Sequence, residues 1–168
     1  MHSTTRSTDS ARYAGTPVQI VALIFGIVFV VVGIAGFIPG LTTNLESLQF
    51  AGHESGALLL GVFQVSILHN CVHILYGLAG LGFAMSFAGS RGYLLWGGLV
   101  YALLFLFGLF VAGDHPANFI PVNAADNWLH IGLAAGMIAL GLLLGVRRAR
   151  VASPSATAGT AGTAGTTR

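Results

Sequence analysis

Long apolar segments separated by short polar ones dominate this chain. No charged residue occurs from Val18 to Ile38, and a helix of that length spans about 30 Å, the hydrocarbon thickness of a bilayer. Three similar segments follow along the chain. The pattern predicts four membrane-spanning helices, at residues 18–38, 66–88, 93–112 and 123–146.

The segments outside these spans are polar or of low complexity. Residues 1–17 are rich in Ser and Thr, and residues 147–168 consist mostly of Arg, Ala, Gly and Thr. Such sequences cannot bury enough apolar surface to fold, so we expect both ends to be disordered around one transmembrane domain, residues 18–146. The first loop ends in the apolar stretch ALLLGVF, which is too short to cross a bilayer and is predicted to lie at its surface.

Composition supports a membrane location. Apolar residues make up 55% of the chain and charged residues 7%, whereas about a quarter of the residues of a typical soluble domain are charged. The single cysteine, Cys71, excludes an intramolecular disulfide. Because the sequence contains no nucleophile elbow, phosphate-binding loop or basic nucleic-acid surface, we expect a protein that is not an enzyme and binds no nucleic acid.

The charges predict the orientation in the membrane. Four of the five acidic residues fall at the end of the bundle that carries no basic residue. Positive charge accumulates on the cytoplasmic side of membrane proteins, so both termini are predicted to be cytoplasmic. The basic residues on that side are Arg6, Arg12, Arg91, Arg147, Arg148, Arg150 and Arg168.

A short internal repeat relates the second and fourth spans. The sequence HNCVHI at 69–74 aligns with DNWLHI at 126–131, and the same offset places Ser66 on Asn123. Ser and Asn are good helix N-caps, and Asn123 with Asp126 is typical of a capping box. We therefore predict an all-α, four-helix transmembrane bundle built from two pseudo-repeated hairpins.

Four polar residues within the repeat form the first candidate site. Asn70, His73, Asn127 and His130 lie on helices that are otherwise apolar, and polar groups in lipid seek partners across helix contacts. Hydrogen bonds among them would fix the register of the two hairpins. This hypothesis predicts a structural or interaction protein with an interhelical polar cluster.

Two alternatives use the same region for chemistry. His69, His73, Asp126 and His130 form two i, i+4 pairs, which together would supply three imidazoles and a carboxylate to a divalent transition metal. In a variant of this idea His73 and His130 are the axial ligands of a b-type haem. In the second alternative these groups conduct protons or a small solute.

Three segments of the chain resemble a known family. GFIPG (36–40), AGHESGALLLGVFQVSILHNCVHILYGLAG (51–80) and ANFIPVNAADNWLHIGLAAGM (117–137) are similar to the actinobacterial four-span membrane proteins grouped as domain of unknown function 4383. The resemblance implies a multi-pass protein of the bacterial cell membrane and brings no established substrate, cofactor or catalytic residue. Beyond the lipid bilayer, the expected partner is a second copy or another membrane protein, because Gly132 with Gly136 and Gly141 with Gly145 have the spacing of helix-packing motifs.

Overall fold

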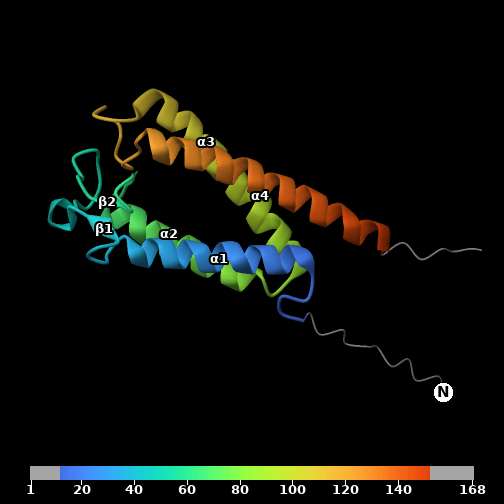
Figure 1. Cartoon of the computed structure of the whole chain (residues 1–168). Helices are drawn as coiled ribbons and strands as arrows, with labels where there is room; N and C mark the ends of the chain where they lie inside the picture. Colours follow the sequence, from blue (N-terminus) through green and yellow to red (C-terminus); the bar gives the residue numbers. More distant parts are fainter. Residues whose placement is uncertain (1–11, 152–168) are drawn as a thin grey trace, which may run out of the picture.

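The computed structural model describes the backbone of residues 12–151 and the side chains of residues 12–145. Four helices form this part of the chain (Figure 1). Three of them are long and apolar enough to cross a membrane, and α2, with 17 residues, is shorter. The helices are α1 (Pro17–Ala35), α2 (Ile67–Phe83), α3 (Phe87–Val111) and α4 (Ala124–Val151).

The second and third helices meet earlier in the chain than the apolar pattern predicts. The spans expected at 66–88 and 93–112 are separated instead by a turn at residues 84–86. Ser86 is the N-cap of α3, and its hydroxyl accepts the backbone N–H of Gly89 at 3.0 Å. Local capping therefore starts the helix within an apolar stretch, and Arg91 lies in the second turn of α3 rather than in a loop.

The helices pack as two sequential hairpins, α1 with α2 and α3 with α4 (Figure 1). Glycines allow the close approach in both. A Cβ atom at Gly26 would lie 2.9 Å from the carbonyl oxygen of Gly77, and one at Gly98 would lie 3.1 Å from that of Ala134. Small residues at contacts of this kind let helix backbones approach in lipid, where the hydrophobic effect does not drive association.

The first loop folds into a small three-stranded antiparallel sheet at one end of the hairpins (Figure 1). Its strands are β1 (Thr42–Thr43), β2 (Leu58–Leu59) and β3 (Phe63–Gln64), and a 3₁₀ turn spans Leu45–Ser47. The ALLLGVF stretch therefore forms strand β2, the turn that follows it and the first residue of β3. Ala57 and Leu59 are buried in a small cluster that packs against Val32 and Ala35 of α1, whereas Leu60 in the turn is exposed.

The described part of the predicted disordered N-terminus, residues 12–16, packs against the turn between α2 and α3. The backbone N–H of Ala14 donates to the carbonyl of Ala84 at 3.3 Å, and the hydroxyl of Tyr13 donates to that of Leu81 at 3.2 Å. Gln19 donates to the same Ala84 carbonyl at 3.0 Å. Most of the two predicted disordered ends lies outside the described residues, and α4 continues to Val151, past the predicted end of its span.

Candidate functional site

Side-chain caps start the two helices that carry the repeat, as the sequence predicts. The hydroxyl of Ser66 accepts the backbone N–H of His69 at 3.1 Å at the start of α2. In α4 the bonding is reciprocal: Asn123 Oδ1 accepts the N–H of Asp126 at 3.0 Å, and Asp126 Oδ2 accepts the N–H of Asn123 at 3.0 Å. The predicted capping box is therefore formed, and both helices begin at the expected residues.

The same carboxylate also binds the first loop. Asp126 Oδ2 accepts the backbone N–H of Gln64 in β3 at 3.0 Å, and the Asn123 side chain donates to the carbonyl of Val62 at 2.7 Å. A third bond joins Gly52 N–H to the Phe119 carbonyl at 2.8 Å. The loop of the first hairpin is thus fastened to the second hairpin at the end where both caps lie.

Two histidines on α2 have a defined arrangement of protons. Nδ1 of His69 lies 3.2 Å from the carbonyl oxygen of Gln64, and Nδ1 of His73 lies 3.0 Å from the carbonyl oxygen of His69. A carbonyl can only accept, so Nδ1 carries the proton in each ring and Nε2 carries a lone pair. The two ring centroids are 4.2 Å apart, which places the two Nε2 acceptors in one small region.

The third histidine comes from the other hairpin. His130 on α4 is 6% exposed, and its Nδ1 is buried with no hydrogen-bond partner. Its ring lies 5.5 Å from that of Tyr101 on α3, measured between centroids. A buried polar atom without a partner is uncommon in folded proteins, so this ring nitrogen is available to a ligand.

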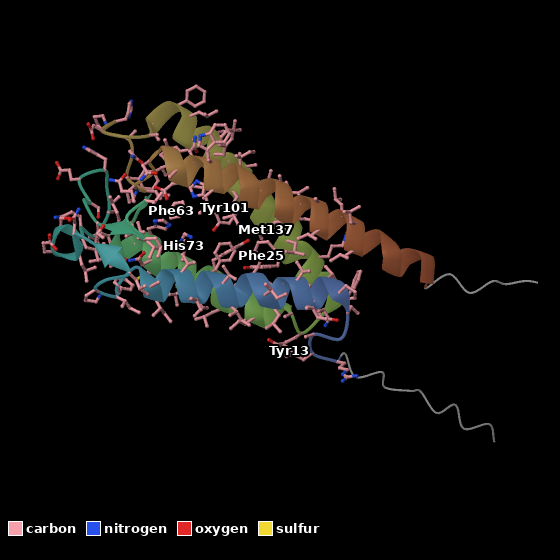
Figure 2. All side chains as sticks on the ribbon, in the orientation of Figure 1. Tyr13, Phe25, Phe63, His73, Tyr101 and Met137 are labelled. Atoms are coloured by element: carbon pink, nitrogen blue, oxygen red, sulfur yellow. The ribbon has the colours of Figure 1, made fainter. Side chains whose placement is uncertain are left out.

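Two cavities lie between the hairpins, and His69, His73 and His130 line both. The α2–α3 cavity, of about 120 Å³, is lined by Ser66, Leu68, His69, Val72, His73, Tyr76, Val100, Tyr101, Leu104, Ile120, Pro121 and His130. The loop cavity, of about 100 Å³, is lined by Val32, Leu59, Leu60, Phe63, Val65, His69, Asn70, His73, Asp126, Leu129, His130 and Leu133. Figure 2 shows His73 and Tyr101 pointing into the region between the hairpins.

Aromatic rings connect the histidines across the two hairpins. Phe29 on α1 meets His73 edge to face at 5.6 Å between centroids and stacks on Tyr101 of α3 at 5.6 Å, with an angle of 8° between the ring planes. Tyr76 completes the group at 5.0 Å from Phe29. His73, Phe29, Tyr101 and His130 therefore form a continuous series of ring contacts from α2 to α4.

The two asparagines of the predicted cluster occupy contacts inside the hairpins. A Cβ atom at Gly36 would overlap the side chain of Asn70, and one at Gly108 would overlap that of Asn127. Within residues 12–145 no hydrogen bond joins any two of the side chains Asn70, His73, Asn127 and His130. Asn70 Nδ2 and Asn127 Oδ1 are buried without a partner. The structure brings Asn70 to the histidines in the loop cavity and leaves Asn127 between α3 and α4.

All four predicted metal ligands, His69, His73, Asp126 and His130, line the loop cavity. In the described part of the chain, however, no three His, Cys, Asp or Glu side chains are grouped so that they would hold a metal ion. The carboxylate of Asp126 already accepts two backbone N–H groups. Metal or haem binding therefore stays a prediction from the sequence.

Sequence reasoning missed the aromatic and backbone parts of the site. Phe29 and Tyr101 are buried between the hairpins, and the backbone of Gln64 holds both Asp126 and His69. The signal for Tyr101 was present, since tyrosine within an apolar span places a hydroxyl in lipid unless it faces the bundle interior. No residue-type signal marks Gln64, because its bonds to Asp126 and His69 come from the backbone.

Comparison with protein families identifies the family of the chain. The model of the family described as a domain of unknown function, DUF4383, matches residues 19–143, and the chain belongs to this family. The search of curated proteins finds no match to the chain, and neither does the search of solved structures.

Proposed function

We propose that this member of the family crosses the bacterial cell membrane four times, with both termini in the cytoplasm. At 17 residues α2 is about 25 Å long, a few ångströms less than the hydrocarbon core, and it lies beside the longer α1. Arg91 contacts α4 at Gly145, at the end opposite the small sheet. That contact supports placing the arginines together on the cytoplasmic face.

Cysteine accessibility tests this topology. In a Cys71→Ser background, Glu54→Cys in the first loop is expected to react with a membrane-impermeant maleimide added to intact cells. Arg91→Cys is expected to react only after the cells are opened. Labelling of both in intact cells, or of neither after lysis, would contradict the orientation.

We infer further that the two hairpins are copies of one unit. The glycines at the close helix contacts recur at a constant interval. Gly98 and Gly108 on α3 follow Gly26 on α1 and Gly36, the C-cap of α1, by 72 residues each. Their partners on α2 and α4 recur at the offset of 57 residues that the sequence repeat has. The two intervals differ because the loop after α1 contains the sheet and the loop after α3 does not.

The function that the geometry supports best is the non-enzymatic binding of a small uncharged molecule between the hairpins. The observation that carries it is the position of His69, His73 and His130, which line both cavities and come from both hairpins. Their free ring nitrogens give a ligand a place to hydrogen-bond in a region that is otherwise apolar. Ligand sites are typically apolar concavities with a few placed polar groups.

Conduction through the membrane has less support. On the side of the histidines away from the small sheet, packed apolar side chains fill the space between the hairpins. Phe29, Leu94 and Met137 are among them. Leu94 and Met137 are completely buried. A proton or solute would have to pass this layer, so binding agrees better with the packing than passage does.

Histidine NMR tests the proposal with phenol as the probe. We expect phenol, added to protein carrying labelled histidine in lipid nanodiscs, to shift the ring resonances of His69, His73 and His130 in a saturable manner. The exposed His115 serves as the control position. His130→Phe is expected to weaken the binding by roughly tenfold, because a buried hydrogen bond is lost, and His115→Phe to leave it unchanged. Shifts confined to His53 and His115, or shifts that do not saturate, would refute a site between the hairpins.

A further inference from the structure

A groove on the outer surface of the helices borders the α2–α3 cavity. It has a volume of about 400 Å³, lies between α2 and α3, and shares Tyr76 and Val100 with that cavity. At its edge Trp96 is 71% exposed and Phe83 is 50% exposed, as expected for side chains that face lipid. We call this feature the α2–α3 groove.

The groove exists because α2 and α3 diverge from the short turn between them and because α3 has glycines there. Gly89, Gly92 and Gly97 line it and contribute no side chain. A Cβ atom at Gly92 would meet no atom within 4 Å. The space is therefore open at this point and, apart from the buried hydroxyl groups of Tyr76 and Tyr93, apolar along its length, which suits a hydrocarbon chain.

The α2–α3 cavity next to the groove offers hydrogen-bonding groups that suit an uncharged ligand. None of the described residues that line the α2–α3 cavity is Asp, Glu, Lys or Arg, so a charged head group would be buried there without a counter-ion, at high cost. His69 and His73 offer lone pairs at Nε2, as their Nδ1 protons are donated to carbonyls. An uncharged group that donates a hydrogen bond is complementary to these acceptors.

We propose that the protein takes an uncharged, hydroxyl-bearing amphiphile directly from the bilayer. The hydroxyl donates to Nε2 of His69 or His73, the buried His130 completes the polar end, and the hydrocarbon chain lies in the α2–α3 groove. This assignment rests on the proposed function and adds to it the class of ligand and its route of entry. The volume of the cavity limits the head to a small group, since an apolar cavity of about 150 Å³ admits one benzene ring.

Photolabelling in nanodiscs tests the assignment. The probes are a long-chain alkylphenol whose chain carries a diazirine, and its methyl ether, which lacks the donor. We expect the alkylphenol to label groove residues such as Trp96 and Phe83, and the methyl ether to label them roughly tenfold less. The variant Gly92→Leu fills the groove and is expected to reduce alkylphenol labelling at least fivefold. Gly132→Leu is the matched control, because Gly132 also has open space at Cβ and lines neither the groove nor the α2–α3 cavity.

The outcomes separate this inference from the proposed function. Equal labelling by the two probes would identify ordinary occupation by hydrocarbon chains and refute the hydroxyl class, and no variant is needed for that comparison. An unchanged pattern in Gly92→Leu would refute the groove as the route. If either occurs while phenol still shifts the three histidines, the binding site stands and only its ligand class or route is wrong. Loss of the phenol response as well would refute both.

Discussion

The carboxylate of Asp126 lies 3.0 Å from the backbone nitrogen of Gln64, and this bond joins parts of the chain that are 62 residues apart. The carbonyl of the same Gln64 accepts Nδ1–H of His69. One residue of the small sheet therefore touches the first turn of both α2 and α4. Through this bridge, the capping residue Asp126 of α4 and the ring of His69 on α2 are held by the same backbone segment.

Asp126→Ala removes the capping-box acceptor and the bond to the loop together. We expect the free energy of unfolding to fall by about 2 kcal/mol, since a helix cap contributes about 1 kcal/mol and the Gln64 N–H loses its partner. Thermal unfolding in detergent measures the change. Asp114→Ala, at an exposed acid of the loop before α4, is the control and should change stability by less than about 0.5 kcal/mol. Equal effects of the two substitutions would argue against the bridge.

Gly36→Ala places a methyl group where the Asn70 side chain lies. The overlap is expected to destabilise the first hairpin by roughly 2 kcal/mol, as overpacking does in well-packed interiors. The double variant Gly36→Ala with Asn70→Ala should recover at least half of that loss, because the overlapping amide is gone. Gly82→Ala is the control, since a Cβ atom there meets nothing within 4 Å. Additive effects of the two substitutions would contradict the contact.

Phe29→Ala removes the ring that connects the histidines of the two hairpins. We expect a loss of about 2 to 4 kcal/mol from the cavity and the missing ring contacts with His73 and Tyr101. Ile27→Ala changes a lipid-facing side chain of the same helix and should have a much smaller effect, because lipid replaces the lost contact. Spin labels on α1 and α3 would report a wider distance distribution only in Phe29→Ala. An unchanged distribution would show that Phe29 does not hold the hairpins together.

Metal analysis of the purified protein decides the remaining hypothesis about His69, His73, Asp126 and His130. Because Asp126 is bonded to two backbone N–H groups, we expect much less than one transition-metal ion per chain after chelation and dialysis against zinc. An equimolar ion that is lost in His69→Ala would overturn this expectation. A visible absorption spectrum of the same sample tests for haem.

Local sequence signals predicted the site in part. The caps at Ser66 and Asn123 follow from residue types within one helical turn, and their hydrogen bonds have the expected partners. The prediction that the histidines face the interior agrees with their place in the cavities. The sequence predicted hydrogen bonds among Asn70, His73, Asn127 and His130, whereas Asn70 and Asn127 each lie at a glycine contact inside one hairpin. The sequence does not show which glycine each side chain meets, because that depends on how the helices pack.

Apolar length and short-range capping were enough to predict the four helices of the described residues near their observed positions, three of which are long and apolar enough to cross a membrane. Both depend on interactions among residues close together in the chain, which a sequence displays directly. The tertiary structure alone decided where α2 ends, how the first loop folds onto α4, and which aromatic rings lie against the histidines. Those features arise from contacts such as Gln64 with Asp126 and Phe29 with Tyr101, whose partners are distant in sequence and adjacent only once the hairpins have packed.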